Sequence, residues 1–310
     1  MTTISASMVK QLRDATGAGM MDCKKALAET DGNVEGAVDW LRKKGLSKAA
    51  KKSDRVAAEG LIGAVSDGKS GAVVEVNSET DFVARNQHFQ DMVGTIAKLS
   101  LKADSDLKKL LAMPYPDKSH SVEDHLKEMI GTIGENMTVR RTAYLHVENG
   151  IVADYMHSKV ANGLGKIGVL VALESTGDSG KLAAFGRQLA MHIAAAAPLA
   201  LSPEELDSEA IEKERAIYLE QAKQTGKPQE IIEKMVEGRL RKEFFQQVVL
   251  PQQTFVIDGK ASVESAIKSA EADVGAPIKV VGFVRYGLGD GIEKKEDDFA
   301  AEVAAAAGKN

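Results

Sequence analysis

One plan of elements occurs twice in the sequence, and this repetition constrains the fold more than any other feature of the chain. Gly71–Ser100 and Ile167–Pro198 each have the pattern of an apolar strand, a polar connection and a helix with an apolar face. Strands and helices of this kind pack as layers around a shared core. The repetition therefore predicts an internal duplication.

The two polar connections differ in one respect that bears on function. Residues 77–83 are NSETDFV, whereas residues 174–180 are ESTGDSG, so only the first connection carries a large apolar side chain. Judged from the residues alone, Thr80 or Asp81 can cap the helix that follows. Phe82 can be a core residue, as phenylalanines usually are. These interpretations stay open beside a binding role.

Two β-hairpins are predicted within the core. The first joins Leu61–Val65 to Ala72–Asn77 through a turn that contains Gly68. The second joins Met137–Val147 to Ile151–Tyr155, because the residues ENG between them are a strong turn signal. Other predicted strands are Ile167–Leu173, Phe255–Ile257 and Val280–Arg285, and other predicted helices run from Phe89 to Ala97, from Ser121 to Ile133 (closed by Gly134) and from Lys181 to Ala197.

The N-terminal part of the chain has a helical period instead. Residues 5–45 predict three short helices, with breaks at Gly17, at Asp31-Gly32 and at Gly45. A basic stretch covers residues 42–55. We interpret it as a solvated linker, with an anion-binding patch as the alternative, because runs of like charge usually stay in water.

The C-terminal half adds a charged helical hairpin at residues 202–249, which predicts a protruding arm. Residues Glu296–Ala307 predict a short helix that docks through Phe299 and Val303, since such a helix is marginal alone. The predicted division is a three-helix domain at 1–54, a first core subdomain at 55–147, a second at 148–201 with 250–287, the arm at 202–249 and a C-terminal module at 288–310.

Composition and charge exclude several classes of protein. A net charge of −5 argues against a nucleic-acid binder, which would carry a basic face. Cys23 is the single cysteine, so an internal disulfide and a multi-cysteine zinc site are both excluded. No apolar run approaches the roughly 20 residues that span a bilayer, and the first residues lack an apolar signal core. We expect a cytoplasmic protein with no membrane partner and no direct nucleic-acid partner.

Two glycine-rich stretches suggest nucleotide binding, and neither has the required context. Gly163–Gly168 matches the dinucleotide-binding glycine pattern but precedes a strand, where it should open a helix. Residues 177–182 look like the end of a phosphate loop. However, Ser175 stands where the first glycine is needed, and Leu182 replaces the hydroxyl residue that holds magnesium.

The histidines give no sign of catalytic or metal chemistry. None of the six belongs to an HExxH pair, and His120 and His125 are five residues apart, which is a poor spacing for one helix face. We therefore predict no catalytic residue, no metal site and no cofactor.

Two longer stretches are much more specific. They are LRDATGAGMMDCKKAL at residues 12–27 and EVNSETDFVAR at residues 75–85, and both resemble signatures of the elongation factor Ts family. The resemblance covers nearly the whole chain and is weakest from about Leu99 to Glu123. Shorter matches continue it at residues 133–136, 226–228, 234–239 and 291–294.

This resemblance implies both a fold and a function. The fold has an N-terminal ubiquitin-associated-like three-helix domain, a core of two related α+β subdomains with small antiparallel sheets, a helical (coiled-coil) hairpin arm and a C-terminal helix. The function is guanine-nucleotide exchange on elongation factor Tu, bound in its GDP-bound and nucleotide-free forms, without enzymatic chemistry. The family also suggests a homodimer through the second core subdomain.

The resemblance further implies which residues contact the partner. The stretch Thr80, Asp81, Phe82 and Val83 enters the GTPase near its magnesium and phosphate site. Further contacts are implied at Met20, Met21, Ile133, Gly134 and His157. A function of a different class is the alternative: an adaptor or chaperone-like scaffold that uses the N-terminal helices and ignores the nucleotide.

Overall fold

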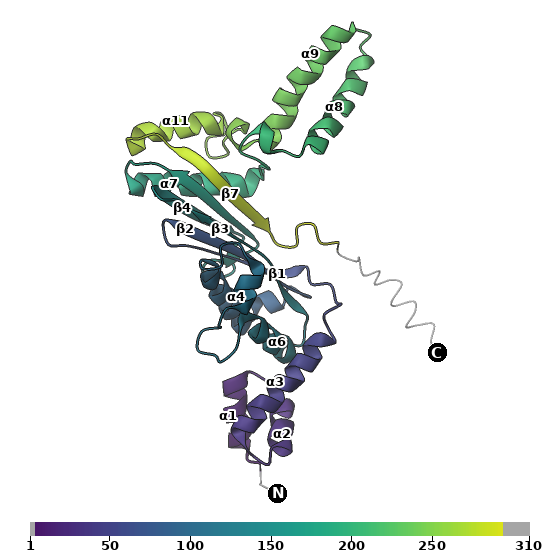
Figure 1. Ribbon diagram of the computed structural model, residues 1–310, viewed down its shortest axis with the longest axis vertical. Helices are drawn as coiled ribbons and strands as arrows, with labels where there is room; N and C mark the ends of the chain where they lie inside the picture. Colours follow the sequence, from purple (N-terminus) through teal and green to yellow (C-terminus); the bar gives the residue numbers. More distant parts are fainter. Residues whose placement is uncertain (1–3, 294–310) are drawn as a thin grey trace, which may run out of the picture.

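The computed structural model describes residues 4–293 and is elongated (Figure 1). A bundle of three N-terminal helices lies at one end, two sheets with their helices form the middle, and a helical hairpin projects at the other end. The predicted helix at Glu296–Ala307 lies outside the described residues. Within the described part of the chain, no helix combines the length and the apolar character needed to cross a membrane.

The N-terminal bundle has the predicted three helices: α1 (Ala6–Thr16), α2 (Met20–Glu29) and α3 (Val34–Ala50). Gly17 ends α1 in a left-handed conformation, with φ of 66°, which suits glycine. The three helices bury a small core of Leu12, Ala18, Cys23, Ala26, Leu27 and Ala37.

The predicted end of the third helix at Gly45 is wrong, because α3 continues to Ala50 and much of the expected linker is helical. Gly45 serves close packing instead. A Cβ atom on Gly131 of the neighbouring helix α6 (Val122–Ile133) would lie only 2.5 Å from the Gly45 Cα atom. The two glycines thus allow α3 and α6 to cross closely, and a glycine at such a crossing does not end a helix.

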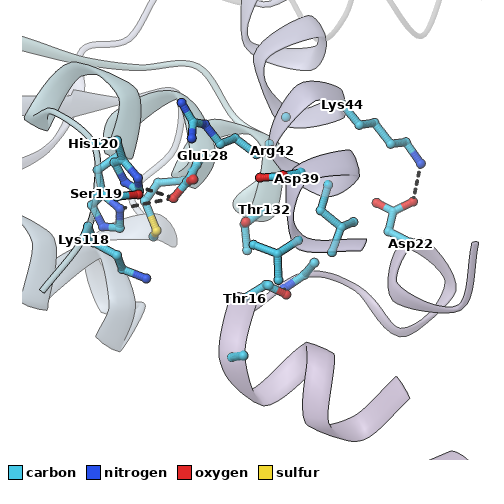
Figure 2. A pocket seen from close by; sticks show the side chains of 18 of the residues that line it. Thr16, Asp22, Asp39, Arg42, Lys44, Lys118, Ser119, His120, Glu128 and Thr132 are labelled. Carbon is cyan, nitrogen blue, oxygen red and sulfur yellow. Dashed lines mark hydrogen bonds and ion pairs between the residues drawn. The ribbon is translucent and has the colours of Figure 1, made fainter. Parts of the chain in front are cut away.

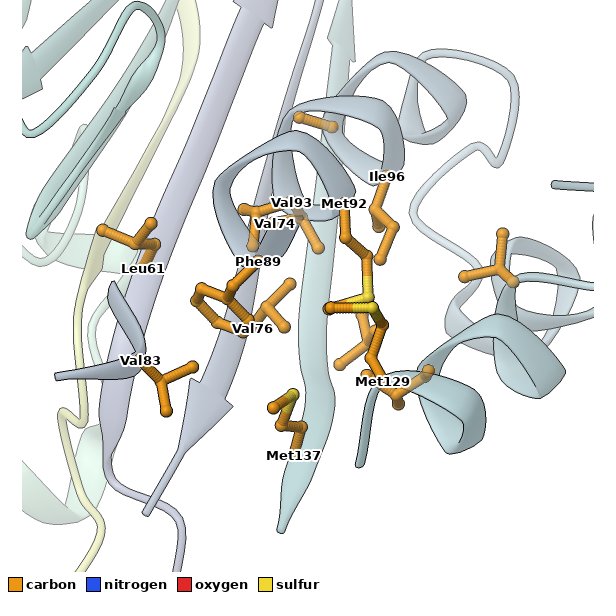
Figure 3. Close-up of a cluster of buried hydrophobic side chains, with 14 of the residues drawn as sticks. Leu61, Val74, Val76, Val83, Phe89, Met92, Val93, Ile96, Met129 and Met137 are labelled. Carbon is orange, nitrogen blue, oxygen red and sulfur yellow. The ribbon is translucent and has the colours of Figure 1, made fainter. Parts of the chain in front are cut away.

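The first sheet is antiparallel and has the strand order β3-β2-β1-β5. Its hairpin of β1 (Glu59–Ser66) and β2 (Ser70–Ser78) confirms the first predicted hairpin. Beneath the sheet, Phe89, Met92 and Ile96 of one covering helix form the centre of the largest core (Figure 3). The remaining elements are β3 (Met137–His146), β5 (Leu164–Gly165), α4 (Gln87–Ser100), α5 (Leu107–Ala112) and α6 (Val122–Ile133).

The second sheet has the order β4-β6-β7 and is also antiparallel. Its strands are β4 (Gly150–His157), β6 (Ile167–Glu174) and β7 (Lys279–Gly287), and its helices are α7 (Ser179–Ala196) and α11 (Val263–Val274). The two sheets share a further cluster that includes Ile62 and Val73 of the first sheet and Val152 and Leu170 of the second. The predicted α+β class with small antiparallel sheets is confirmed, and the exact domain boundaries stay a prediction.

The second predicted hairpin is wrong, because β3 and β4 lie in different sheets. β3 pairs with β2, and β4 pairs with β6. The backbone N–H groups of Val147 and Val152 donate to Lys69 and Gly68, at the tip of the first hairpin, with N–O distances of 3.0 and 2.7 Å. The ENG turn therefore carries the chain from one sheet to the other.

The predicted strand at Phe255–Ile257 is also wrong. Phe255 is buried in the second core, whereas Val256 and Ile257 are exposed, and these residues belong to a loop that leads into α11. Residues 255–257 therefore form a loop that is anchored by the buried Phe255 side chain, and they pair with no strand.

The arm consists of α8 (Ser208–Lys223) and α9 (Gln229–Arg239), followed by a π-helical turn at Leu240–Phe245 and the short helix α10 (Gln246–Val248). Four buried side chains, Ala222, Ile232, Val236 and Leu240, form a small cluster inside the arm. Single 3-10 turns complete the elements at η1 (Val83–Arg85), η2 (Pro203–Glu205) and η4 (Leu250–Gln252).

Candidate functional site

The stretch Thr80–Val83 lies in the connection between β2 and α4, and its first half is held by the segment that follows α6. The backbone N–H and hydroxyl groups of Thr80 both donate to the Glu135 carboxylate, at 2.9 and 2.6 Å. Ser78, which is buried, donates its hydroxyl to the Thr80 carbonyl at 3.0 Å. Glu79 accepts from the backbone N–H of Asn136. The loop therefore leaves the strand in one defined direction.

The second half of the connection is held by the core. The side chains of Val83 and Ala84 are buried beneath α4 (Figure 3 shows Val83). Gln90 donates its side-chain amide to the Ala84 carbonyl at 2.8 Å. Asn86 caps α4 by accepting from the backbone N–H of His88 at 2.9 Å. Both ends of the connection are fixed.

Between these anchors, Asp81 and Phe82 point into solvent. The Phe82 residue is 73% exposed, so the interpretation of Phe82 as a core residue is wrong. The Asp81 side chain is 52% exposed, and its nearest cation is Arg85, at 3.9 Å between Oδ2 and Nη2. Since Asn86 caps α4, neither Thr80 nor Asp81 has the capping role that the sequence left open.

Ile133 and Gly134 are brought to the same place. Ile133 is half-buried against the first core, and Gly134 ends α6 with a left-handed φ of 90°. The Gly134 carbonyl accepts from the Lys52 ammonium group. Because Glu135 directly follows Gly134 and holds Thr80, the end of α6 forms one wall of the site.

The other predicted contacts lie on separate elements (Figure 1). Met20 and Met21 begin α2 in the N-terminal bundle and are 58% and 77% exposed. His157 ends β4 in the second sheet, is exposed, and has its Nδ1 atom 3.3 Å from the Tyr155 hydroxyl. The predicted contacts are therefore spread along one elongated molecule.

Sequence reasoning missed the part played by Glu135 and Asn136. Their positions directly after the glycine that ends α6 were the available signal, because a chain leaving a helix there is free to bond a neighbouring strand end. Nothing in the sequence indicated which strand end would be the neighbour. The contact joins residues 55 positions apart.

Comparisons with known proteins agree with this organisation. The family described as Elongation factor TS matches residues 79–290. An elongation factor Ts of Parvibaculum lavamentivorans is 63% identical over 307 residues, which cover 99% of both chains. Those of Bartonella henselae and Rhizobium etli are each 59% identical, over 98% and 99% of this chain and 99% of their own lengths. On this evidence the chain belongs to the elongation factor Ts family.

Proposed function

We propose that this protein is a guanine-nucleotide exchange factor that promotes GDP release from elongation factor Tu during translation elongation. The observation that carries the proposal is the exposed Phe82 beside Asp81, on a loop fixed at both ends. A large aromatic side chain held in solvent adds nothing to the core, and aromatic residues are enriched at the centres of protein–protein interfaces. Family membership supplies the identity of that partner.

The mechanism needs no catalytic group. A GTPase holds its nucleotide through phosphate-loop N–H groups and a magnesium ion. An exchange factor binds the nucleotide-free form more tightly than the loaded form, and by linkage it weakens nucleotide binding by the same factor. A 10⁴-fold weakening requires about 5.5 kcal/mol of differential affinity. Burying one aromatic side chain supplies roughly 1.5–3 kcal/mol, so Phe82 needs help from other contacts.

We assign different parts to the residues of the site. Phe82 acts as an apolar wedge, and Asp81 brings a carboxylate towards the magnesium site, where a negative charge disturbs the coordination of the ion. Thr80 and Val83 are positioning residues, since one is bonded to Glu135 and the other is buried. A loop that is already ordered loses little conformational entropy when it binds.

The remaining affinity is assigned to the outlying positions. Met20 and Met21 on the N-terminal bundle, Ile133 and Gly134 beside the loop, and His157 on the second sheet are the proposed docking contacts. Bound partners are the GDP-bound and nucleotide-free forms of elongation factor Tu. Self-association through the second core subdomain stays a prediction.

The test measures melting temperature and GDP release from GDP-loaded elongation factor Tu for the same set of variants. Phe82→Ala should melt almost normally, as exposed substitutions do, yet accelerate GDP release about 10- to 100-fold less well, which corresponds to the loss of one buried aromatic. Asp81→Asn keeps the side-chain size and removes the charge, so it measures the electrostatic part separately.

A matched control is Leu199→Ala, because Leu199 is 69% exposed and has no proposed contact role. It should leave both the melting temperature and GDP release unchanged. If Phe82→Ala accelerates GDP release as well as the unmodified chain does, Phe82 does not act as a wedge. If the unmodified chain binds elongation factor Tu without changing GDP release, the adaptor function replaces the proposed one.

A further inference from the structure

A cavity of about 470 Å³ lies where the N-terminal bundle meets α6 (Figure 2). One wall comes from the three N-terminal helices and the other from α6 and the loop before it. On the second wall, His120 and Glu128 face each other (Figure 2), and His125 approaches the same carboxylate. None of these three residues has a part in the proposed exchange function.

The three side chains converge on one point. His120 Nε2 and His125 Nδ1 lie 3.3 and 3.5 Å from the same oxygen, Oε2 of Glu128, and all three atoms lie within 4.8 Å of one another. Zinc–nitrogen and zinc–oxygen bonds of about 2.0–2.2 Å place neighbouring ligands of a tetrahedral zinc ion about 3.3 Å apart. Two of the ligand pairs already have this spacing.

The histidine nitrogens are buried and only weakly satisfied. The side chains of His120 and His125 are only 7% and 13% exposed. Within residues 4–293, neither His120 Nε2 nor His125 Nδ1 makes a hydrogen bond of good geometry, although both lie beside the Glu128 carboxylate, at 3.3 and 3.5 Å. Buried polar atoms nearly always have a well-placed partner, and an ion bound between these three atoms would give each of them one.

The surrounding turn holds these rings in place. Tyr115 donates its backbone N–H to the His120 carbonyl at 2.9 Å, and its ring lies 3.9 Å from the His125 ring, centroid to centroid. Ser121 caps α6 directly after His120. Because His120 precedes this cap, it lies outside the helix. The spacing of five residues therefore says nothing about one helix face, which is why the sequence indicated no metal site.

The second core subdomain contains a similar turn, one residue longer, without the three ligands. There Ser262 caps α11, and Phe255 donates its backbone N–H to the Ala261 carbonyl at 2.8 Å. Counting from the two capping serines, the counterparts of His120, His125 and Glu128 are Ala261, Ala266 and Ser269. The turn and helix therefore form without this triad, so the fold alone does not account for it.

We propose that His120, His125 and Glu128 bind a divalent transition-metal ion of the zinc class, with a fourth position open to water from the cavity. Two imidazoles and one carboxylate are a ligand set that zinc takes when one position stays open. Magnesium and calcium prefer all-oxygen sites, so the two nitrogens select against them. The residues that line the cavity also include the cations Arg42 and Lys118 and the anions Asp39 and Asp117.

The bound ion would join the loop before α6 to the helix itself. This wall also meets α3 through the close crossing of Gly45 and Gly131. The site therefore lies at the contact between the N-terminal bundle and the first core subdomain. Metal binding fixes the loop and α6, which form the core's side of this contact, and the inference does not depend on the exchange function.

The experiment uses the full chain, treated with a chelator and then titrated with Zn²⁺ by calorimetry and with Co²⁺ by absorption. We expect about one ion per chain and the intense visible bands of four-coordinate Co²⁺. The combined variant His120→Ala, His125→Ala and Glu128→Ser installs the residues of the second subdomain. Its affinity for Zn²⁺ should fall by more than the roughly 10- to 100-fold that loss of an outer-shell partner costs.

Two controls separate this site from surface binding. His146→Ala breaks an exposed histidine–glutamate pair, His146 with Glu148, that has the same 3.3 Å spacing. His88→Ala removes an exposed histidine that does not belong to the proposed site. Both variants should bind Zn²⁺ as the unmodified chain does.

Several results would overturn the proposal. These are absence of Zn²⁺ binding by the chelator-treated chain, equal binding by the combined variant, and loss of binding in the His146→Ala control. Tighter binding of Mg²⁺ than of Zn²⁺ would also do so. If the combined variant does not fold, Glu128→Gln decides the matter, because it keeps the side-chain size and removes the charged ligand. Undiminished Zn²⁺ affinity in that variant would contradict the site.

Discussion

The two halves of the core are built on one plan and differ where the plan is interrupted. The first runs β1-β2-α4-α6-β3 and the second β4-β6-α7-α11-β7, with the same antiparallel pairings. β3 and β7 carry a bulge at matching positions: Arg140 of β3 is the extra residue opposite Glu75 and Val76 of β2, and Val281 of β7 is the extra residue opposite Ala172 and Leu173 of β6. α6 and α11 both have 12 residues, a serine cap and a left-handed glycine at the end. This confirms the predicted duplication.

The interruptions differ in kind. Asp178 caps α7 almost directly after β6, whereas β2 and α4 are separated by residues 79–86, which include Asp81 and Phe82. The second half instead carries the arm, between α7 and α11. The helices and strands common to both halves supply the two cores. Residues 79–86 and the arm, which each occur in one half only, carry exposed side chains. Partner contacts are therefore best sought in segments that one half has and the other lacks.

One departure lies inside the first sheet and is structural. Glu75 is fully buried, and its carboxylate accepts from Arg140 and Arg141 and from the backbone N–H of Gly289, the last at 2.8 Å. Its counterpart in the second half is Ala172. The network ties the first sheet to the turn after β7.

The largest expected effect on stability therefore comes from Glu75→Ala, which installs the second half's residue in the first. Two arginines lose the carboxylate that balances their charge, and removing one partner of a buried ion pair costs about 3–5 kcal/mol. Urea unfolding monitored by circular dichroism measures this loss. If Glu75→Ala lowers the free energy of unfolding by less than about 1 kcal/mol, the Glu75 network does not stabilise the first half as proposed.

A smaller and symmetrical effect is expected at Gly71 and Gly168, which are counterparts in β2 and β6. A Cβ atom on Gly71 would lie 2.6 Å from a Val152 methyl group, and one on Gly168 would lie 2.6 Å from an Ile62 methyl group. Overpacking of this kind costs about 1–3 kcal/mol. Gly71→Ala and Gly168→Ala should lower the free energy of unfolding by similar amounts. Tolerance of one and not the other would break the equivalence of the two halves.

Local features of the fold could be predicted from the sequence because their causes are local. The helix-ending Gly17 and Gly134 and the first hairpin all depend on neighbours within a few positions. The exposure of Phe82 was predicted only through the family resemblance, because phenylalanines are usually buried. The sequence itself contained the difference between the two connections.

The wrong predictions concern places where contacts with segments distant in the sequence determine the local structure. The ENG turn suits a hairpin, yet contacts with Gly68 and Lys69 direct the next strand into the other sheet. Gly45 suits a helix end, yet α6 uses it for close packing. Neither of these partners is near in the sequence.

The pH dependence of stability offers a finer test of the Glu75 network. Burial alone would raise the pKa of Glu75, but the Gly289 N–H, the Asn77 amide and Arg141 together hold it below its ordinary value of 4.5. The carboxylate therefore adds stability that is complete above about pH 4.5 and is lost as the pH falls through the folded-state pKa.

The measurement compares urea unfolding of the unmodified chain and of Glu75→Gln between pH 7 and the acid range. The difference in free energy of unfolding should be constant near neutral pH and narrow below about pH 4.5, by at most about 1.4 kcal/mol per pH unit. If the difference in free energy of unfolding widens on acidification, the folded-state pKa of Glu75 lies above its ordinary value and not below it.

The smallest expected effect is that of removing the arm. Its buried residues, such as Ile232 and Leu240, form a cluster separate from the second core. Its two ends are already side by side, because Leu199 donates to the Val248 carbonyl at 2.7 Å and Leu250 to the Ala200 carbonyl at 2.9 Å. Replacing residues 203–246 by a short Gly-Ser linker should therefore leave those end contacts in place.

The free energy of unfolding of the core should then change by less than about 1 kcal/mol, since closing a loop of different length costs only about 0.6 kcal/mol per doubling. GDP release from elongation factor Tu should remain at least partly accelerated, because the loop with Phe82 belongs to the other half. Calorimetric melting and the exchange assay measure both quantities. A deletion variant that does not fold would show that the second half, unlike the first, depends on its inserted segment, and that the two halves are alike in topology but not in stability.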